Sequence, residues 1–295
     1  MSAQGKITTI AAKAKILRFP SVTPNEKRLL IPREHGSWAL WMLPLISGGI
    51  VGFAGTPRAA TAPALWFCLV ASAAFLIHQP LESLLGVSVF KVRSLREQRI
   101  AVFWVIGLTS MAVLGVIALL QLQRGLVFAF GLAAAACFAL AALFGSARSL
   151  RVAKQLVGAL GLTSTAAGAY YVTTGRVDRT ALELWLACWL FAAGQIEYVQ
   201  LRLRTAYARS RYDKVKAGWQ VCFLHLLVLA AAITAVAALQ LPRLVAFAFV
   251  PGVARIFVWM FSRVRPLKLY VLGFSELLQN IIFAALLTAA FLARG

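Results

Sequence analysis

The sequence predicts an all-α, polytopic integral membrane protein with about nine transmembrane helices. Of its 295 residues, 61% are hydrophobic and only 13% are charged, whereas soluble domains draw about 25% of their residues from the charged types. The apolar runs extend for about 20 residues, the length that a helix needs to cross a bilayer core. They lack the two-residue alternation of a membrane β-barrel, so helical spans are expected throughout.

The first 35 residues are basic and carry Ile7, Ile10, Ala14 and Leu17 at helical spacing. This pattern is typical of an amphipathic helix that lies in the membrane interface. The segment lacks the apolar centre and cleavage site of a signal peptide, so we expect it to be retained. We therefore predict a basic cytoplasmic N-terminal segment, 1–35, and a single transmembrane helical domain, 36–295.

The transmembrane domain is predicted to contain nine spans, each close to the length of a bilayer core. They cover residues 36–54, 62–82, 101–121, 125–145, 156–173, 181–200, 219–238, 243–262 and 268–292. The four cysteines lie inside these apolar runs without a CxxC arrangement, which predicts packing residues and not a disulfide or zinc framework.

The distribution of Lys and Arg predicts the orientation. Counted over alternate loops, 23 of the 30 lie on the side of the N-terminus and six on the opposite side. Since basic residues are enriched in cytoplasmic loops, the N-terminus is expected inside and the C-terminus outside. The net charge of +21 then reflects topology and contact with anionic phospholipids, and we predict no nucleic-acid partner.

Ionisable side chains inside the spans are expensive unless they are paired or hydrated, and they therefore indicate where function lies. They fall in the half of the membrane predicted to face the cytoplasm, which predicts one polar cavity opening inward. These residues are Glu34, His35, His78, Glu82, Glu197, His225, Arg255 and Glu276.

A divalent cation such as Mg²⁺ is a candidate cofactor. His78 and Glu82 are four residues apart and share a helix face, while Glu34 and His35 enter from the neighbouring helix at the same membrane level. Together these four residues form a candidate ligand set. The alternative is that the carboxylates pair with Arg33, Arg93, Arg202 or Arg204 and only hold the inner helix ends together.

Arg255 and Glu276 are predicted to be charge partners because they lie at similar depth on consecutive antiparallel helices. We interpret this pair first as structural. Asn280, one turn beyond Glu276, extends the network or lines the cavity. His225 stands among Leu, Val and Ala, and we interpret it as a hydrogen-bonded core residue in preference to a haem ligand.

The basic loop 201–218 typically binds anionic headgroups. The more specific hypothesis is that Arg202 and Arg204 clamp a phosphate or diphosphate with their guanidinium groups, and that Arg93 contributes from the corresponding loop after the second span. A lipid with a charged head under these loops and a tail between the helices fits this polarity. The candidate substrate-binding residues are Arg93, Tyr198, Arg202, Arg204, Arg255, Glu276 and Asn280.

The string IPREHGSWAL at residues 31–40 resembles the PREHG-type opening of the YwiC-like membrane proteins, a bacterial family. The segment 78–85, HQPLESLL, gives weaker support. This resemblance implies a location in the bacterial cytoplasmic (inner) membrane.

The predicted topology also resembles the UbiA superfamily of intramembrane prenyltransferases, in which aspartate-rich motifs after helices two and six hold magnesium on a prenyl diphosphate. Here only Glu82 and Glu197 stand at the corresponding positions. The resemblance implies that, in an active enzyme, Glu82 and Glu197 would anchor the metal or the diphosphate. His35 or His78 would then serve as a ligand or as general base.

The leading hypothesis is therefore a UbiA-like membrane protein that binds an isoprenoid or diphosphate-type lipid in a cytoplasm-facing cavity, a candidate divergent prenyltransferase. The missing aspartates favour one alternative, a non-catalytic membrane subunit or assembly factor with a membrane-protein partner. A small-anion transporter is a further alternative, although the sequence lacks the paired broken helices typical of transporters.

Overall fold

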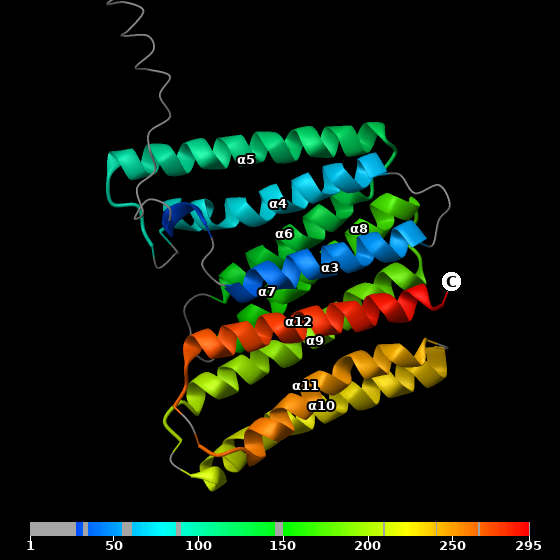
Figure 1. Cartoon of the computed structure of the whole chain (residues 1–295). Helices are drawn as coiled ribbons and strands as arrows, with labels where there is room; N and C mark the ends of the chain where they lie inside the picture. The colour runs from blue at the N-terminus through cyan, green and yellow to red at the C-terminus, as the bar shows by residue number, and fades with distance from the viewer. Residues whose placement is uncertain are drawn as a thin grey trace, which may run out of the picture. The chain divides into compact units, whose positions relative to one another are not determined.

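The computed structural model describes residues 28–31, 35–54, 61–86, 90–144, 150–208, 210–239, 241–264 and 266–294. Within these ranges the chain forms helices and no strand, which confirms the predicted all-α class (Figure 1). The longer helices are α3 (His35–Ala54), α4 (Thr61–Leu84), α5 (Leu95–Gln121), α6 (Val127–Leu143), α7 (Arg151–Thr163), α8 (Thr165–Thr174), α9 (Arg179–Arg204), α10 (Arg211–Leu239), α11 (Arg243–Phe261) and α12 (Leu269–Leu292).

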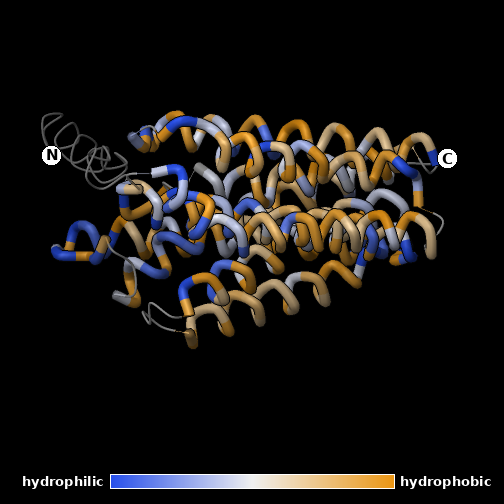
Figure 2. Tube along the Cα trace, turned by 90° about the horizontal axis from the view of Figure 1, so that it is seen from below, coloured by the Kyte–Doolittle hydropathy of each residue, from blue (hydrophilic) through white to orange (hydrophobic). Residues whose placement is uncertain are grey.

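Six helices in the described part of the chain have the length and apolar composition of a membrane span, namely α3, α4, α5, α10, α11 and α12. Helix α6 is also apolar but shorter, with 17 residues. Hydrophilic residues gather towards the helix ends and hydrophobic residues along the middle (Figure 2). The chain is therefore an integral membrane protein, while the count of nine spans and the side of the N-terminus stay predictions.

The fifth predicted span, 156–173, differs from the structure, which divides this region at Ser164 into α7 and α8. The hydroxyl of Thr163 donates to the carbonyl of Ala159 (2.8 Å), and that of Ser164 donates to the carbonyl of Gly161 (2.7 Å). Such side-chain bonds compete with the backbone ladder and tend to bend helices.

Two other helices begin before their predicted spans, because polar residues extend them beyond the apolar runs. Helix α5 starts at Leu95 instead of 101, and α10 starts at Arg211 instead of 219. Hydropathy marks the part of a helix that lies in the bilayer and gives no measure of its polar extension.

The described residues form two compact units. The smaller unit comprises 28–31, 76–86 and 90–107, and the larger comprises 35–54, 61–75 and the described residues from 108 to 294. In the smaller unit Leu29 and Leu30 are buried beside Ile100, and the Ser83 hydroxyl donates to the Leu29 carbonyl (3.4 Å). The division at residue 35 stays a prediction, because residues 1–27 lie outside the described ranges.

In the larger unit, α3 packs against α8 and α12, and α11 packs against α10 and α12 (Figure 1). Part of its core is aromatic. Phe191 of α9 stacks on Phe283 of α12 with ring centroids 3.9 Å apart, and Phe249 of α11 meets Phe283 edge-on at 5.3 Å. Offset stacks and edge-on contacts are the favoured aromatic geometries, so this cluster joins α9, α11 and α12.

Helices α3 and α8 approach each other closely because α3 carries Gly48 and Gly52. A Cβ atom at Gly48 would overlap the carbonyl oxygen of Ala166, and one at Gly52 would overlap the hydroxyl of Thr173. Small residues four apart are typical of close contacts between membrane helices. The contact between α3 and α8 therefore depends on glycine at both positions.

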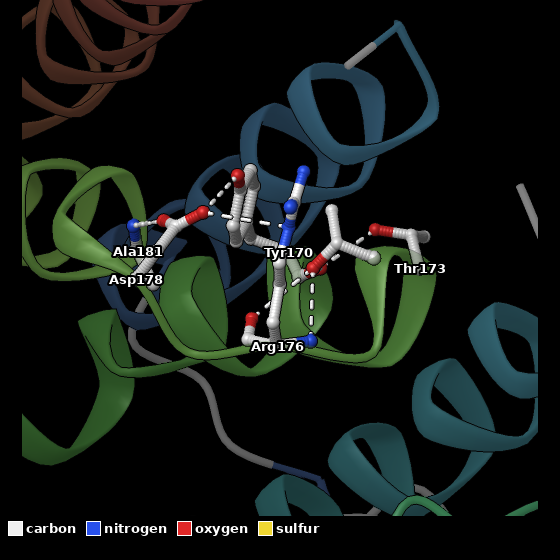
Figure 3. A network of polar contacts seen from close by, with 6 residues as sticks. Tyr170, Thr173, Arg176, Asp178 and Ala181 are labelled. Carbon is white, nitrogen blue, oxygen red and sulfur yellow. Dashed lines mark hydrogen bonds and ion pairs between the residues drawn. The ribbon is translucent and has the colours of Figure 1, made fainter. Parts of the chain in front are cut away.

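The turn from α8 to α9 is held by one carboxylate (Figure 3). Gly175 ends α8 with a φ of 80°. Asp178 caps α9, with Oδ1 accepting from the backbone N–H of Ala181 (3.3 Å) and Oδ2 accepting from the hydroxyl of Tyr170 (2.9 Å). The Nε of Arg176 lies 3.8 Å from Oδ2. Asp178 thus ties α8 to the first turn of α9.

We expect Asp178→Ala to lower the free energy of unfolding by about 1–2 kcal/mol, because loss of an N-cap typically costs about 1 kcal/mol and the Tyr170 hydroxyl loses its acceptor. Denaturant unfolding in detergent measures this change. Asp178→Asn keeps a capping oxygen and should retain most of the stability. Equal stability of Asp178→Ala and wild type would show that this carboxylate does not hold the turn.

Candidate functional site

In the smaller unit, His78 and Glu82 share a face of α4 as their spacing predicts. Nε2 of His78 lies 3.4 Å from Oε1 of Glu82, and both side chains are partly exposed. Arg93 lies in the same unit, where its backbone N–H donates to Oε2 of Glu97 (2.7 Å). The structure therefore pairs Glu82 with His78.

The predicted cation site is only partly described. Glu34 and the side chain of His35 lie outside the described residues. Among the side chains that are described, no three His, Cys, Asp or Glu residues lie together in a way that could hold a metal ion. His78 and Glu82 supply one nitrogen and one carboxylate, whereas Mg²⁺ requires an octahedral set made mainly of oxygens. These two residues do not form a metal site by themselves, and the four-residue set stays a prediction.

In the larger unit, Arg255 of α11 and Glu276 of α12 form the predicted ion pair. Nη1 of Arg255 lies 2.7 Å from Oε1 of Glu276, and the two side chains are only 11% and 10% exposed. Nη2 also donates to Oε1 of Gln195 on α9. The guanidinium carbon lies 3.9 Å from the ring centroid of Tyr198. One buried cluster thus connects α9, α11 and α12.

Asn280 continues this cluster along α12. Its amide Nδ2 donates to the backbone carbonyl of Glu276 (2.8 Å), and its side chain lines a cavity of about 10 Å³ with Ser47 and Thr163. Asn280 therefore lies between Glu276 and a small cavity that α3 and α7 also line.

The two predicted phosphate-clamp residues, Arg202 and Arg204, have different surroundings. Nη1 of Arg202 donates to the hydroxyl of Tyr198 (3.0 Å), and its guanidinium lies 5.8 Å from the ring centroid of Trp259. Arg204 is 63% exposed and lies 3.7 Å from Oε2 of Glu197. Glu197 therefore pairs with Arg204, as the structural alternative predicts, while Arg202 makes no ion pair with any carboxylate that the structure describes.

Two further residues, Lys214 and Gln195, were not among the predicted site residues. Lys214 of α10 is buried and donates through Nζ to the carbonyl (2.9 Å) and hydroxyl (3.1 Å) of Ser262. A cation that bonds the last carbonyls of a helix is favourable, so Lys214 attaches α10 to the end of α11. The sequence feature that could have identified Gln195 as a site residue is its position as a polar amide within an apolar run.

His225 of α10 is buried and hydrogen-bonded, in agreement with its interpretation as a core residue. Its Nδ1 lies 2.8 Å from the carbonyl oxygen of Val221, one turn back along the helix.

Comparison with known proteins identifies one family. Residues 31–170 match the family model of the YwiC-like proteins, a range that includes the motif at 31–40 and the pair His78 and Glu82. No curated protein and no solved structure matches the chain. The cluster around Arg255 lies beyond the matched range, and the UbiA resemblance stays an expectation. The resemblance indicated by the motif is confirmed by this match: residues 31–170 of the chain are similar to the YwiC-like proteins.

Proposed function

We propose that this protein binds an amphipathic lipid with a phosphate or diphosphate headgroup, with isoprenoid diphosphates as the leading class. The headgroup would lie at the end of the larger unit where α9 and α11 finish and α10 and α12 begin. We call this the basic end, defined by Arg202, Arg204, Arg211, Lys214, Lys216, Arg263 and Lys268. By the enrichment of basic residues on the inner side, we further propose that it faces the cytoplasm of a bacterial inner membrane.

The observation that carries this proposal is the environment of Arg202. Tyr198 and Trp259 hold its guanidinium in place, and no described carboxylate forms an ion pair with it. The buried carboxylate of the neighbouring cluster, Glu276, is already bound by Arg255. A guanidinium offers a planar fork of N–H donors that matches phosphate oxygens, so an anionic headgroup is the acceptor that suits Arg202.

The opposite end of the larger unit differs in charge balance. There Glu183 accepts from Arg179 (2.6 Å) and from Arg294 (2.7 Å), and Asp178 lies near Arg176. Three of its arginines, Arg176, Arg179 and Arg294, therefore have carboxylate partners within the protein. This contrast supports the basic end as the place where an external anion binds.

Apolar surface adjoins the basic end and supports a ligand with a hydrophobic tail. Phe257 and Phe261 of α11 stack with ring centroids 6.5 Å apart, and Phe261 is exposed. Phe274, near the start of α12, is also exposed. A lipid with its headgroup at Arg202 would find aromatic surface beside these helix ends.

The proposal extends to binding and not to transfer. Prenyl transfer would require Glu82, Glu197 and a histidine at one site. Glu82 and His78 belong to the smaller unit and Glu197 to the larger, so their meeting at one site stays a prediction. The roles of these residues, and of His35, in catalysis stay predictions from the resemblance.

We expect Arg202→Gln to weaken binding of farnesyl diphosphate about 10- to 100-fold. A hydrogen bond to a charged group contributes roughly 1.5–3 kcal/mol, and about 1.4 kcal/mol corresponds to tenfold in affinity. Native mass spectrometry of the protein in lipid nanodiscs measures the affinity. The comparison variant Arg263→Gln removes an exposed cation from the same end and should weaken binding much less than Arg202→Gln does. Farnesol, which has the same tail without phosphates, should bind both variants equally.

Two results would contradict the proposal. The first is that wild-type protein binds farnesyl diphosphate no more tightly than farnesol. The second is that Arg263→Gln weakens binding as much as Arg202→Gln does. The second result would indicate diffuse attraction of anions to a basic surface. A different pair of results would favour the alternative that the protein is a non-catalytic membrane subunit. In that case a stable protein partner would copurify equally well with wild type and with Arg202→Gln, and wild type would show no preference among the lipids tested.

A further inference from the structure

A cavity of about 20 Å³ lies between α9, α10 and α11. Of the residues that line it, Gln195 and His225 have polar side chains, and apolar side chains such as Leu190 and Val253 form most of its wall. Gly194 and Gly252 also line it, so the space exists because two positions lack side chains. A water molecule needs roughly 10–15 Å³ and at least two polar partners. The cavity therefore has room for one water molecule and for no larger ligand.

The imidazole of His225 presents a hydrogen-bond acceptor to this cavity. Its Nδ1 lies 2.8 Å from the carbonyl oxygen of Val221, and since a carbonyl can only accept, Nδ1 carries the hydrogen. Nε2 of the neutral ring then has a free lone pair. A Cβ atom placed on Gly194 would lie 3.2 Å from Nε2, so Nε2 faces the position that this glycine leaves open. Its side chain is buried, and no described residue bonds Nε2.

The amide of Gln195 supplies a donor at the same cavity. Because the guanidinium of Arg255 only donates, the bond between them fixes the oxygen of Gln195 on Arg255. The amide nitrogen is then left for the other side, and none of the described residues accepts from it. Gln195 is 5% exposed, and a buried amide without a partner is costly.

We propose that this cavity binds one internal water molecule, which donates to Nε2 of His225 and accepts from the amide of Gln195. The water joins His225 of α10 to the cluster of Gln195, Arg255 and Glu276. All four helices α9 to α12 then share one hydrogen-bonded network between two titratable side chains, and His225 becomes a positioning residue for Gln195 and Arg255. This inference goes beyond the proposed lipid binding and does not depend on it.

Substitution of Gly252 tests the site. A methyl group here would meet only Cδ2 of His225, at 4.0 Å, so Gly252→Ala fills the cavity without a clash. If the methyl displaces a bridging water, the Tm of the full-length protein in nanodiscs falls by about 2–8 °C because two buried polar groups lose their partner. Gly252→Ser supplies a hydroxyl in place of the water and should recover most of that loss. The control Gly131→Ala in α6, where a Cβ has nothing within 4 Å, should leave the Tm unchanged or raise it.

A second measurement observes the acceptor directly. In ¹⁵N-histidine-labelled protein, assigned with His225→Leu, the Nε2 resonance of His225 should show the upfield shift of a hydrogen-bonded imine nitrogen. Gly252→Ala should move it to the position of a free one. The inference is overturned if Gly252→Ala raises the Tm as the control does, since a dry cavity gains from being filled, or if the Nε2 resonance is the same in wild type and Gly252→Ala.

Discussion

Replacing Glu276 with leucine is expected to lower the free energy of unfolding by about 3–5 kcal/mol. The carboxylate is the one described anion that contacts the guanidinium of Arg255, and both side chains are nearly buried. Removing one partner of a buried ion pair leaves the other as an uncompensated charge, which is the costly case. In a membrane span this cost is not relieved by bulk water.

The double variant Arg255→Leu/Glu276→Leu should be considerably more stable than Glu276→Leu alone, because it removes the stranded charge together with its partner. Equilibrium unfolding in mixed micelles measures all the variants in one cycle. Arg204→Leu provides a matched control, since Arg204 is 63% exposed beside Glu197 and an exposed ion pair contributes only about 0–1 kcal/mol. Additive effects of the two leucine substitutions would contradict a direct pair.

The Arg255 and Glu276 pair was predictable because it depends on local geometry. The two residues lie on consecutive antiparallel helices, so equal distance from a shared loop places them at equal depth. Gln195 and Tyr198 were not assigned to this pair, because they reach Arg255 from α9. Which helix packs beside α11 is decided by long-range contacts that hydropathy does not report.

The surroundings of Arg202 and Arg204 could not be predicted from the sequence for the same reason, because they depend on which helices pack together. The sequence treats them as equivalent, two residues apart on the last turn of α9. That spacing points them in different directions on a helix, and the partners differ accordingly: Tyr198 and Trp259 for Arg202, Glu197 for Arg204. Trp259 lies on another helix, so the distinction required the packed structure.

Contacts between residues that are close in the sequence could be predicted from their spacing alone. The spacing of His78 and Glu82 predicts that they share a helix face, and they do. In contrast, the division at Ser164 depends on hydroxyl groups that bond backbone carbonyls. Thr163 and Ser164 do not interrupt the apolar run, so hydropathy predicts one continuous span over residues 156–173.

The second large effect is expected at the contact between α3 and α8, where two adjacent glycines should respond in opposite ways. A methyl group at Gly48 would overlap the backbone oxygen of Ala166, whereas one at Gly49 has nothing within 4 Å. A backbone atom cannot turn aside as a side chain can, so α3 and α8 must separate to admit the methyl.

We therefore expect Gly48→Ala to lower the free energy of unfolding by about 3 kcal/mol, the upper part of the usual range for overpacking. Gly49→Ala should leave it unchanged or raise it by up to about 1 kcal/mol, because alanine is the better helix former. Thermal unfolding of both variants in the same detergent tests the difference. Since the substitutions are chemically identical and adjacent on one helix, only the distance to α8 separates them. Equal stability of the two variants would show that α3 and α8 do not approach closely at Gly48.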